Sequence, residues 1–116
     1  MECREDTLRI AIELIRSALE SYMLSNCRRT VSMAKLTGQT RVRLEFHGLF
    51  RHYTPSEEFP RFMDALDYVV KCGGIEKLKE ILRARDVVLE GDMYVLYDFA
   101  EYEKVCYGFY EEASTS

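Results

Sequence analysis

The sequence contains no tryptophan, only two prolines and only six glycines among its 116 residues. So little Pro and Gly excludes a collagen-like chain and a proline-rich disordered one. No uninterrupted run of about 18 apolar residues occurs, which argues against a membrane-spanning helix and a membrane partner. Because 47% of the residues are apolar, the chain can bury a core, and we predict one domain over residues 1–116 with a frayed tail at about 111–116.

The chain also lacks closely spaced cysteines. Its four cysteines stand at positions 3, 27, 72 and 106, whereas zinc sites normally use at least one short ligand pair. The N-terminal MECREDTLR does not have the basic and then apolar order of a signal peptide. We therefore expect a cytoplasmic protein without metal or cofactor, in which the cysteines are free thiols. Two disulfides are the alternative.

The sequence also lacks motifs that are characteristic of a particular enzymatic reaction. There is no G-x-S-x-G sequence and no glycine-rich loop of the kind that binds phosphates or dinucleotides. His47 and the nearby Glu45 form the one acid–base pair that the spacing suggests, as in a small nuclease. A catalytic histidine needs an orienting partner, and neighbouring surface residues of this kind are usually simple contacts, so we expect a protein that is not an enzyme.

Charge is distributed unevenly along the chain. Residues 28–53 contain six basic residues and one acidic residue, a net charge of +5, whereas residues 86–116 contain one basic and eight acidic residues, a net charge of −7. A cationic segment inside an acidic protein indicates a negatively charged partner. Its alternative partner is the acidic end of the same chain or of a second copy.

The clearest periodic pattern lies near the N-terminus. Apolar residues recur at steps of three and four from Leu8 to Met23, which predicts a helix. Its apolar face is wider than one packing partner requires. We therefore expect a homodimer through this first helix, with Ile15 at the contact.

Residues 30–50 permit two interpretations. Val42, Leu44 and Phe46 alternate with polar residues, which predicts a strand, and Val31 with Met33 could form the partner strand of a hairpin that turns at residues 37–40.

The second interpretation of this segment is helical. The A-x-x-x-G spacing of Ala34 and Gly38, with Leu44 after it, resembles that of a helix-turn-helix. That resemblance implies a second helix that enters the major groove of duplex DNA.

The remaining patterns complete an α+β domain. We predict a helix that begins at Thr54–Pro55 or near Phe59 and stops at Gly73–Gly74, and a short helix after it. Three β-rich runs follow, joined at residues 90–92 and 100–103. The predicted order is thus an N-terminal helix, a β-hairpin, two helices and a C-terminal β-meander, with one mostly antiparallel sheet.

These patterns lead to a functional expectation. Arginines beside tyrosines suit phosphates and unstacked bases, so we predict a nucleic-acid-binding protein that prefers single-stranded DNA or RNA and has little sequence specificity. The predicted binding residues are Arg28, Arg29, Lys35, Arg41, Arg43, His47, Arg51 and Tyr53. The alternatives are an interaction or assembly subunit whose basic segment docks an acidic protein surface, and a regulator that binds duplex DNA.

Overall fold

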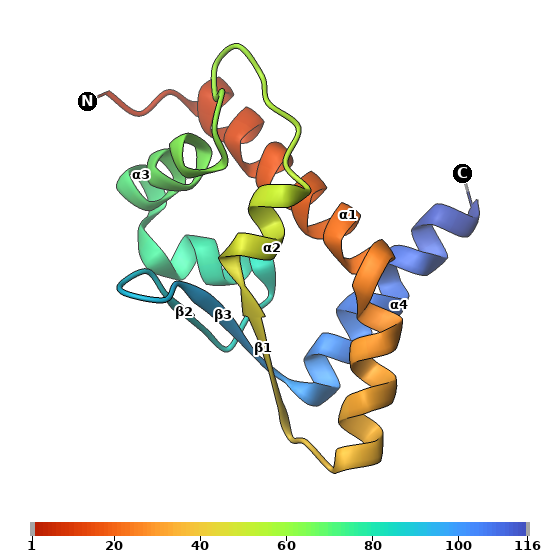
Figure 1. Cartoon of the computed structure of the whole chain (residues 1–116). Helices are drawn as coiled ribbons and strands as arrows, with labels where there is room; N and C mark the ends of the chain where they lie inside the picture. The colour runs from red at the N-terminus through yellow and green to blue at the C-terminus, as the bar shows by residue number, and fades with distance from the viewer. Residues whose placement is uncertain (1, 116) are drawn as a thin grey trace.

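The computed structural model describes residues 2–115 (Figure 1). In chain order the elements are α1 (Glu5–Thr37), β1 (Arg41–Glu45), α2 (Phe46–Arg51), α3 (Phe62–Leu82), β2 (Asp86–Val88), β3 (Tyr94–Asp98) and α4 (Phe99–Thr115). The three strands form one antiparallel sheet in the order β1-β3-β2. The predicted α+β class is confirmed, with more helix and less strand than expected.

The first helix is longer than its neighbours. It continues to Thr37 because Cys27, Val31 and Ala34, spaced four and three residues apart, remain on its buried face. Gly38 ends it in the left-handed conformation, with φ 68°. Residues 31–33 are therefore helical, and the predicted strand there is wrong.

The strand at residues 41–45 has a distant partner. β1 pairs with β3, so that Val42 lies opposite Tyr97 and Leu44 lies opposite Val95. Both the local hairpin and the helix-turn-helix at residues 30–50 are thus wrong. The period of two identified the strand correctly, but it does not say which other strand matches it. Phe46 begins α2 instead of extending the strand.

The third predicted strand of the meander is also wrong. The hairpin of β2 and β3 around Gly91 forms as expected, but residues 104–110 lie in α4. Tyr102, Val105 and Cys106 are buried there, and their steps of three and one fit a helix that packs against α1. The helix includes residues 111–115 of the predicted frayed tail, and residue 116 lies outside the described residues.

Residues 52–61 contain no helix, so α3 begins later than either predicted start. Asp64 accepts a 3.0 Å hydrogen bond from the backbone N–H of Arg61 and so closes the first turn. The predicted stop at Gly73–Gly74 and the helix after it are confirmed, because α3 consists of two helices merged across a kink. The break is at Gly74, whose φ of 75° and ψ of 176° are not helical, and the second helix runs to Leu82.

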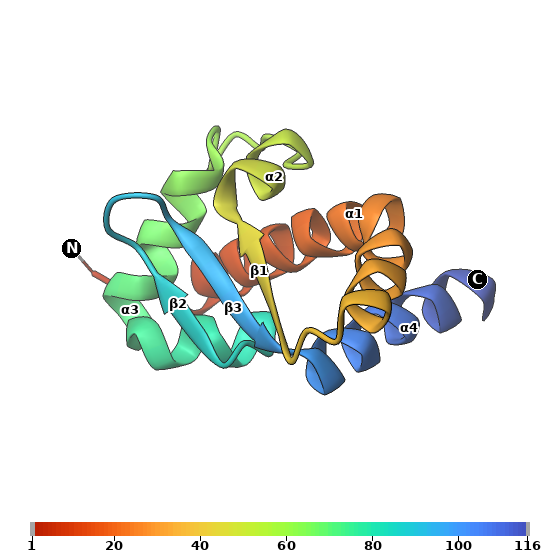
Figure 2. The ribbon, with the colours of Figure 1, turned by 60° about the horizontal axis from the view of Figure 1, so that its bottom comes forward.

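The core lies between the helices and one face of the sheet. Figure 2 shows α1 passing behind the sheet, whose other face is turned toward the viewer. Alternate strand residues, among them Leu44, Val95 and Tyr97, are buried on the helical side. Ile15 is also fully buried within its own chain, so the expected dimer contact there has no surface to use.

Both pairs of cysteines form disulfides, Cys3–Cys72 and Cys27–Cys106. The expectation of free thiols is therefore wrong. The two bonded pairs are separated by 69 and by 79 positions in the sequence, and only the tertiary fold brings their partners together. The spacing of the cysteines therefore gave no information on which of them pair. Among residues 2–115, no helix combines the length and the apolar character needed to cross a bilayer.

Candidate functional site

The eight predicted binding residues are distributed over four parts of the chain. Arg28, Arg29 and Lys35 belong to the second half of α1, Arg41 and Arg43 to β1, His47 and Arg51 to α2, and Tyr53 to the segment that follows α2. Each of five hollows on the surface of the described chain is lined by at most one of them. None of these five hollows of the described chain therefore brings two of the eight residues together.

Cations from the middle of the chain meet carboxylates from its end. The Lys35 ammonium lies 2.9 Å from Glu103 of α4, and this hydrogen bond raises the pKa of Lys35. Arg41 of β1 lies 3.6 Å from Asp98 of β3, which also contacts Arg85 at 3.2 Å. All of these pairs are at least partly exposed, so each adds little to stability. They nevertheless reduce the positive charge available to a ligand.

Two other arginines lie over tyrosine rings. Arg43 is 3.8 Å from the centroid of the Tyr94 ring and also donates a 2.8 Å hydrogen bond to Glu45. Arg28 is 4.1 Å from the centroid of the Tyr110 ring. Both contacts are cation–π interactions, which fix the guanidinium groups on the surface of their own chain.

The histidines do not form a catalytic arrangement. His47 Nε2 lies 3.1 Å from an Arg51 nitrogen, and it accepts this hydrogen bond because arginine has only donors. Glu45 is bonded to Arg43 and therefore does not orient His47. His52 Nδ1 lies 2.9 Å from Ser21 Oγ, but this contact is exposed and lies in none of the five hollows. Among residues 2–115, neither histidine combines a nucleophile, an orienting acid and a cavity, the arrangement expected of a catalytic histidine.

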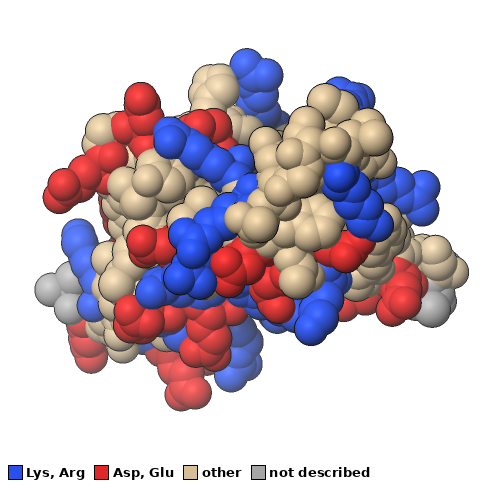
Figure 3. All heavy atoms as spheres, turned by 90° about the horizontal axis from the view of Figure 1, so that it is seen from below, with Lys and Arg blue, Asp and Glu red and all other residues tan. Residues whose placement is uncertain are grey.

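No helix of residues 2–115 covers the outer face of the sheet, called here the open sheet face (Figure 2). It carries the residues that alternate with the buried ones, namely Arg41, Arg43, Glu45, Asp86, Val88, Tyr94, Leu96 and Asp98. Three acidic residues offset the two arginines and the adjacent Arg85. Figure 3 shows the same balance, since blue and red side chains are interleaved on the side of the molecule seen from below.

The most apolar hollow lies between α2, residues 52–61 and the start of α3. We call it the aromatic hollow. Its volume is about 410 Å³, and it is lined by Phe50, Tyr53, Pro55, Pro60, Arg61, Phe62 and Met63. Both prolines of the chain are thus found in one place. The ring of Phe62 packs against those of Phe50 and Tyr53, with centroids 5.5 and 5.6 Å apart.

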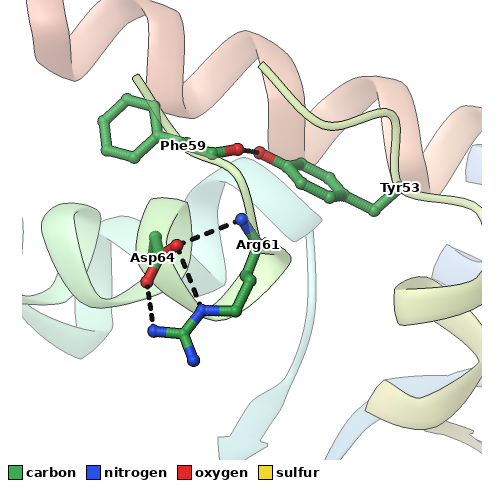
Figure 4. Close-up of polar contacts among 4 residues, drawn as sticks. All are labelled: Tyr53, Phe59, Arg61 and Asp64. Atoms are coloured by element: carbon green, nitrogen blue, oxygen red, sulfur yellow. Dashed lines mark hydrogen bonds and ion pairs between the residues drawn. The ribbon is translucent and has the colours of Figure 1, made fainter. Parts of the chain in front are cut away.

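The polar groups at this hollow are already bonded within the chain. The Tyr53 hydroxyl donates to the carbonyl oxygen of Phe59, and the Arg61 guanidinium donates to both carboxylate oxygens of Asp64 (Figure 4). These bonds from Arg61 lower the pKa of Asp64. Tyr53 is therefore a wall of the hollow and not a free stacking platform. The hollow offers apolar contact more than hydrogen bonding.

Sequence reasoning missed this hollow. None of Phe50, Pro60, Phe62 and Met63 was among the predicted binding residues, although aromatics and both prolines within 14 positions were a usable signal. Among the described residues, no cluster of three or more His, Cys, Asp or Glu could hold a metal ion. Comparison with protein-family models, with curated proteins and with solved structures finds no match of any of the three kinds.

Proposed function

We propose that the chain is a protein-interaction subunit that holds an extended, proline-containing segment of a partner protein in the aromatic hollow. The observation that carries the proposal is the lining. Apart from Arg61, which is bonded to Asp64, every residue around the hollow is aromatic, proline or methionine. Grooves lined by aromatic rings bind proline-rich segments, because such segments are extended before they bind and lose little entropy.

The state of the hollow supports this occupant. Phe50 remains 39% exposed at its rim although it is a large apolar residue. Residues 52–61 are held in place by the bond from Tyr53 to Phe59 and by a 3.0 Å bond from the Phe59 N–H to Ser56 Oγ. A preformed wall lowers the cost of binding. A small polar substrate fits less well, since such ligands require free polar groups to orient them.

The test is selection from a phage-displayed library of random peptides. We expect selected peptides to be rich in proline and apolar residues, and we expect Phe50→Lys to weaken their binding by about tenfold or more. Ile75→Lys is the matched control, because Ile75 is 36% exposed and lies outside the hollow. Peptides that bind wild type and the Phe50→Lys protein equally would overturn the proposal, as would a failure to select any peptide.

A second candidate is binding of single-stranded nucleic acid on the open sheet face. It is favoured by the presence of Arg41, Arg43 and the half-buried ring of Tyr94 on one face. Filter binding of labelled single strands at two salt concentrations tests it. Binding should fall steeply with salt and weaken in Arg41→Ala and Arg43→Ala proteins. If no nucleic acid binds at low salt, this second candidate is excluded and peptide binding is the remaining proposal.

A further inference from the structure

We infer that the free edge of β1 is the contact for a second copy of this chain, paired antiparallel with its own β1. This surface is separate from the aromatic hollow, so the inference stands independently of peptide binding. Its basis is the combination of an unpaired strand edge with the sequence of that strand, Arg41-Val-Arg-Leu-Glu45.

The direction of the backbone groups identifies the free edge. The Phe46 N–H donates to the Met93 carbonyl at 3.2 Å, and the Phe99 N–H donates to the Thr40 carbonyl at 2.9 Å. These residues stand opposite each other in the register of β1 with β3. Since hydrogen-bonded pairs alternate along an antiparallel ladder, the even-numbered residues of β1 bond β3.

The odd-numbered residues therefore aim their backbone groups the other way. In the sheet order β1-β3-β2 no described strand lies on that side (Figure 2). The side chains of Arg41, Arg43 and Glu45 are 50%, 46% and 54% exposed. A row of unpaired N–H and C=O groups of this kind is a template for another strand.

The sequence of β1 selects a second copy as that strand. Antiparallel pairing about a two-fold axis at Arg43 makes hydrogen-bonded pairs of the odd-numbered residues. Arg41 then stands opposite Glu45 of the second copy, and by symmetry this pair forms twice. On the inner face, Val42 stands opposite Leu44 of the second copy, so the apolar layer continues across the contact. The product is one six-stranded sheet.

One cross-strand pair opposes this contact. The two copies of Arg43 face each other at the axis, and like charges directly opposite destabilise a sheet. Each Arg43 is already bonded to Glu45 of its own chain and lies on its own Tyr94 ring. The two arginines are therefore held by their own chains. Arg41 and Glu45 add attraction on both sides while each keeps its contact within its own chain, with Asp98 and with Arg43.

A charge exchange tests the inference by sedimentation equilibrium. Wild type should have a mass about twice 13.6 kDa. Arg41→Glu and Glu45→Arg each place like charges opposite one another, so each protein alone should dimerise at least about tenfold more weakly. An equimolar mixture of the two restores opposite charges at both pairs and should form a heterodimer.

Two further variants separate the contact from general effects on folding. Arg43→Pro removes an N–H on the free edge, where proline is tolerated, and should leave a folded monomer by circular dichroism. Arg29→Glu changes an exposed arginine of α1 and should leave dimerisation unchanged. A monomeric wild type would overturn the inference, and so would single variants that dimerise like wild type or fail to pair when mixed.

Discussion

Cys27 in α1 and Cys106 in α4 form a disulfide although they are 79 residues apart, and both residues are fully buried. The other disulfide joins Cys72 in α3 to Cys3, which is exposed and precedes α1. The first helix is thus bonded in its second half to the last helix, and the chain just before it is bonded to α3. The two bonds differ mainly in their access to solvent.

This difference predicts the order of reduction. Under native conditions a thiol reductant should open Cys3–Cys72 first, because attack on Cys27–Cys106 requires the core to open. Alkylation followed by mass spectrometry would locate the free thiols at each time. Equal rates for the two bonds would contradict this prediction.

Removing the buried disulfide should weaken the fold. By the loop-entropy model a bond closing so long a loop stabilises the folded state by about 4 kcal/mol. The Cys27→Ala/Cys106→Ala protein should lose an amount of this order in urea unfolding. The Cys3→Ala/Cys72→Ala protein is the matched control for loop length, since its bond spans 69 residues. A loss below about 1 kcal/mol in the buried pair would argue against this entropic stabilisation.

Tyr97→Phe should destabilise the protein by roughly 1–3 kcal/mol. The hydroxyl of Tyr97 donates a 2.8 Å hydrogen bond to the Leu82 carbonyl at the end of α3, and both residues are fully buried. Without the hydroxyl, that carbonyl loses this partner away from water. Tyr94→Phe, on the open sheet face, should change the free energy of unfolding by no more than about 0.5 kcal/mol. An equal loss of unfolding free energy in the two variants would contradict a stabilising role for the hydrogen bond from Tyr97 to Leu82.

Alkaline pH should unfold the protein through its buried tyrosines. Burial raises the pKa of Tyr102 from 10.0 to about 12, and it raises the pKa of Tyr97 further. Between these values the folded state binds more protons than the unfolded state. The contribution of Tyr102 is therefore complete below pH 10 and is lost as the pH rises from 10 to about 12.

The size of that contribution can be measured directly. Two pKa units correspond to roughly 2–3 kcal/mol, so urea unfolding should show a fall of this order from Tyr102 across the window. Tyr102→Phe should reduce the slope of stability against pH. Ionisation of all eight tyrosines near pH 10 before any unfolding, measured by the full tyrosinate absorbance change, would contradict the raised pKa values of Tyr102 and Tyr97.

Gly74→Ala should cost on the order of 1–3 kcal/mol, because the φ of 75° and ψ of 176° at the kink of α3 are nearly confined to glycine. Gly108 provides a contrast in α4. It has no positive φ, and a Cβ there would meet no atom within 4 Å. Gly108→Ala should therefore stabilise the protein by about 0.5–1 kcal/mol. Thermal unfolding should therefore show a lower melting temperature for Gly74→Ala and a higher one for Gly108→Ala. A shift in the same direction for both variants would contradict the prediction.

Local patterns were sufficient for several elements. The first helix follows from the apolar steps of three and four after Leu8, and the hairpin at residues 86–98 follows from two β-rich runs around Gly91. Local patterns failed where one segment fits two structures. Val31 and Met33 alternate like a strand, yet Val31 also continues the helical spacing from Cys27, and packing of that face decided for helix.

The candidate sites show the same division. Sequence alone placed Arg41 and Arg43 on the wet face of a strand and indicated that the acidic end of the chain could neutralise the basic middle. Only the tertiary structure decided that Glu103 reaches Lys35, that Asp98 reaches Arg41, and that Phe50 and both prolines line one hollow. The reason is physical. Periodicity reports contacts between neighbours a few residues apart, whereas ion pairs, disulfides and hollows depend on which distant segments pack together.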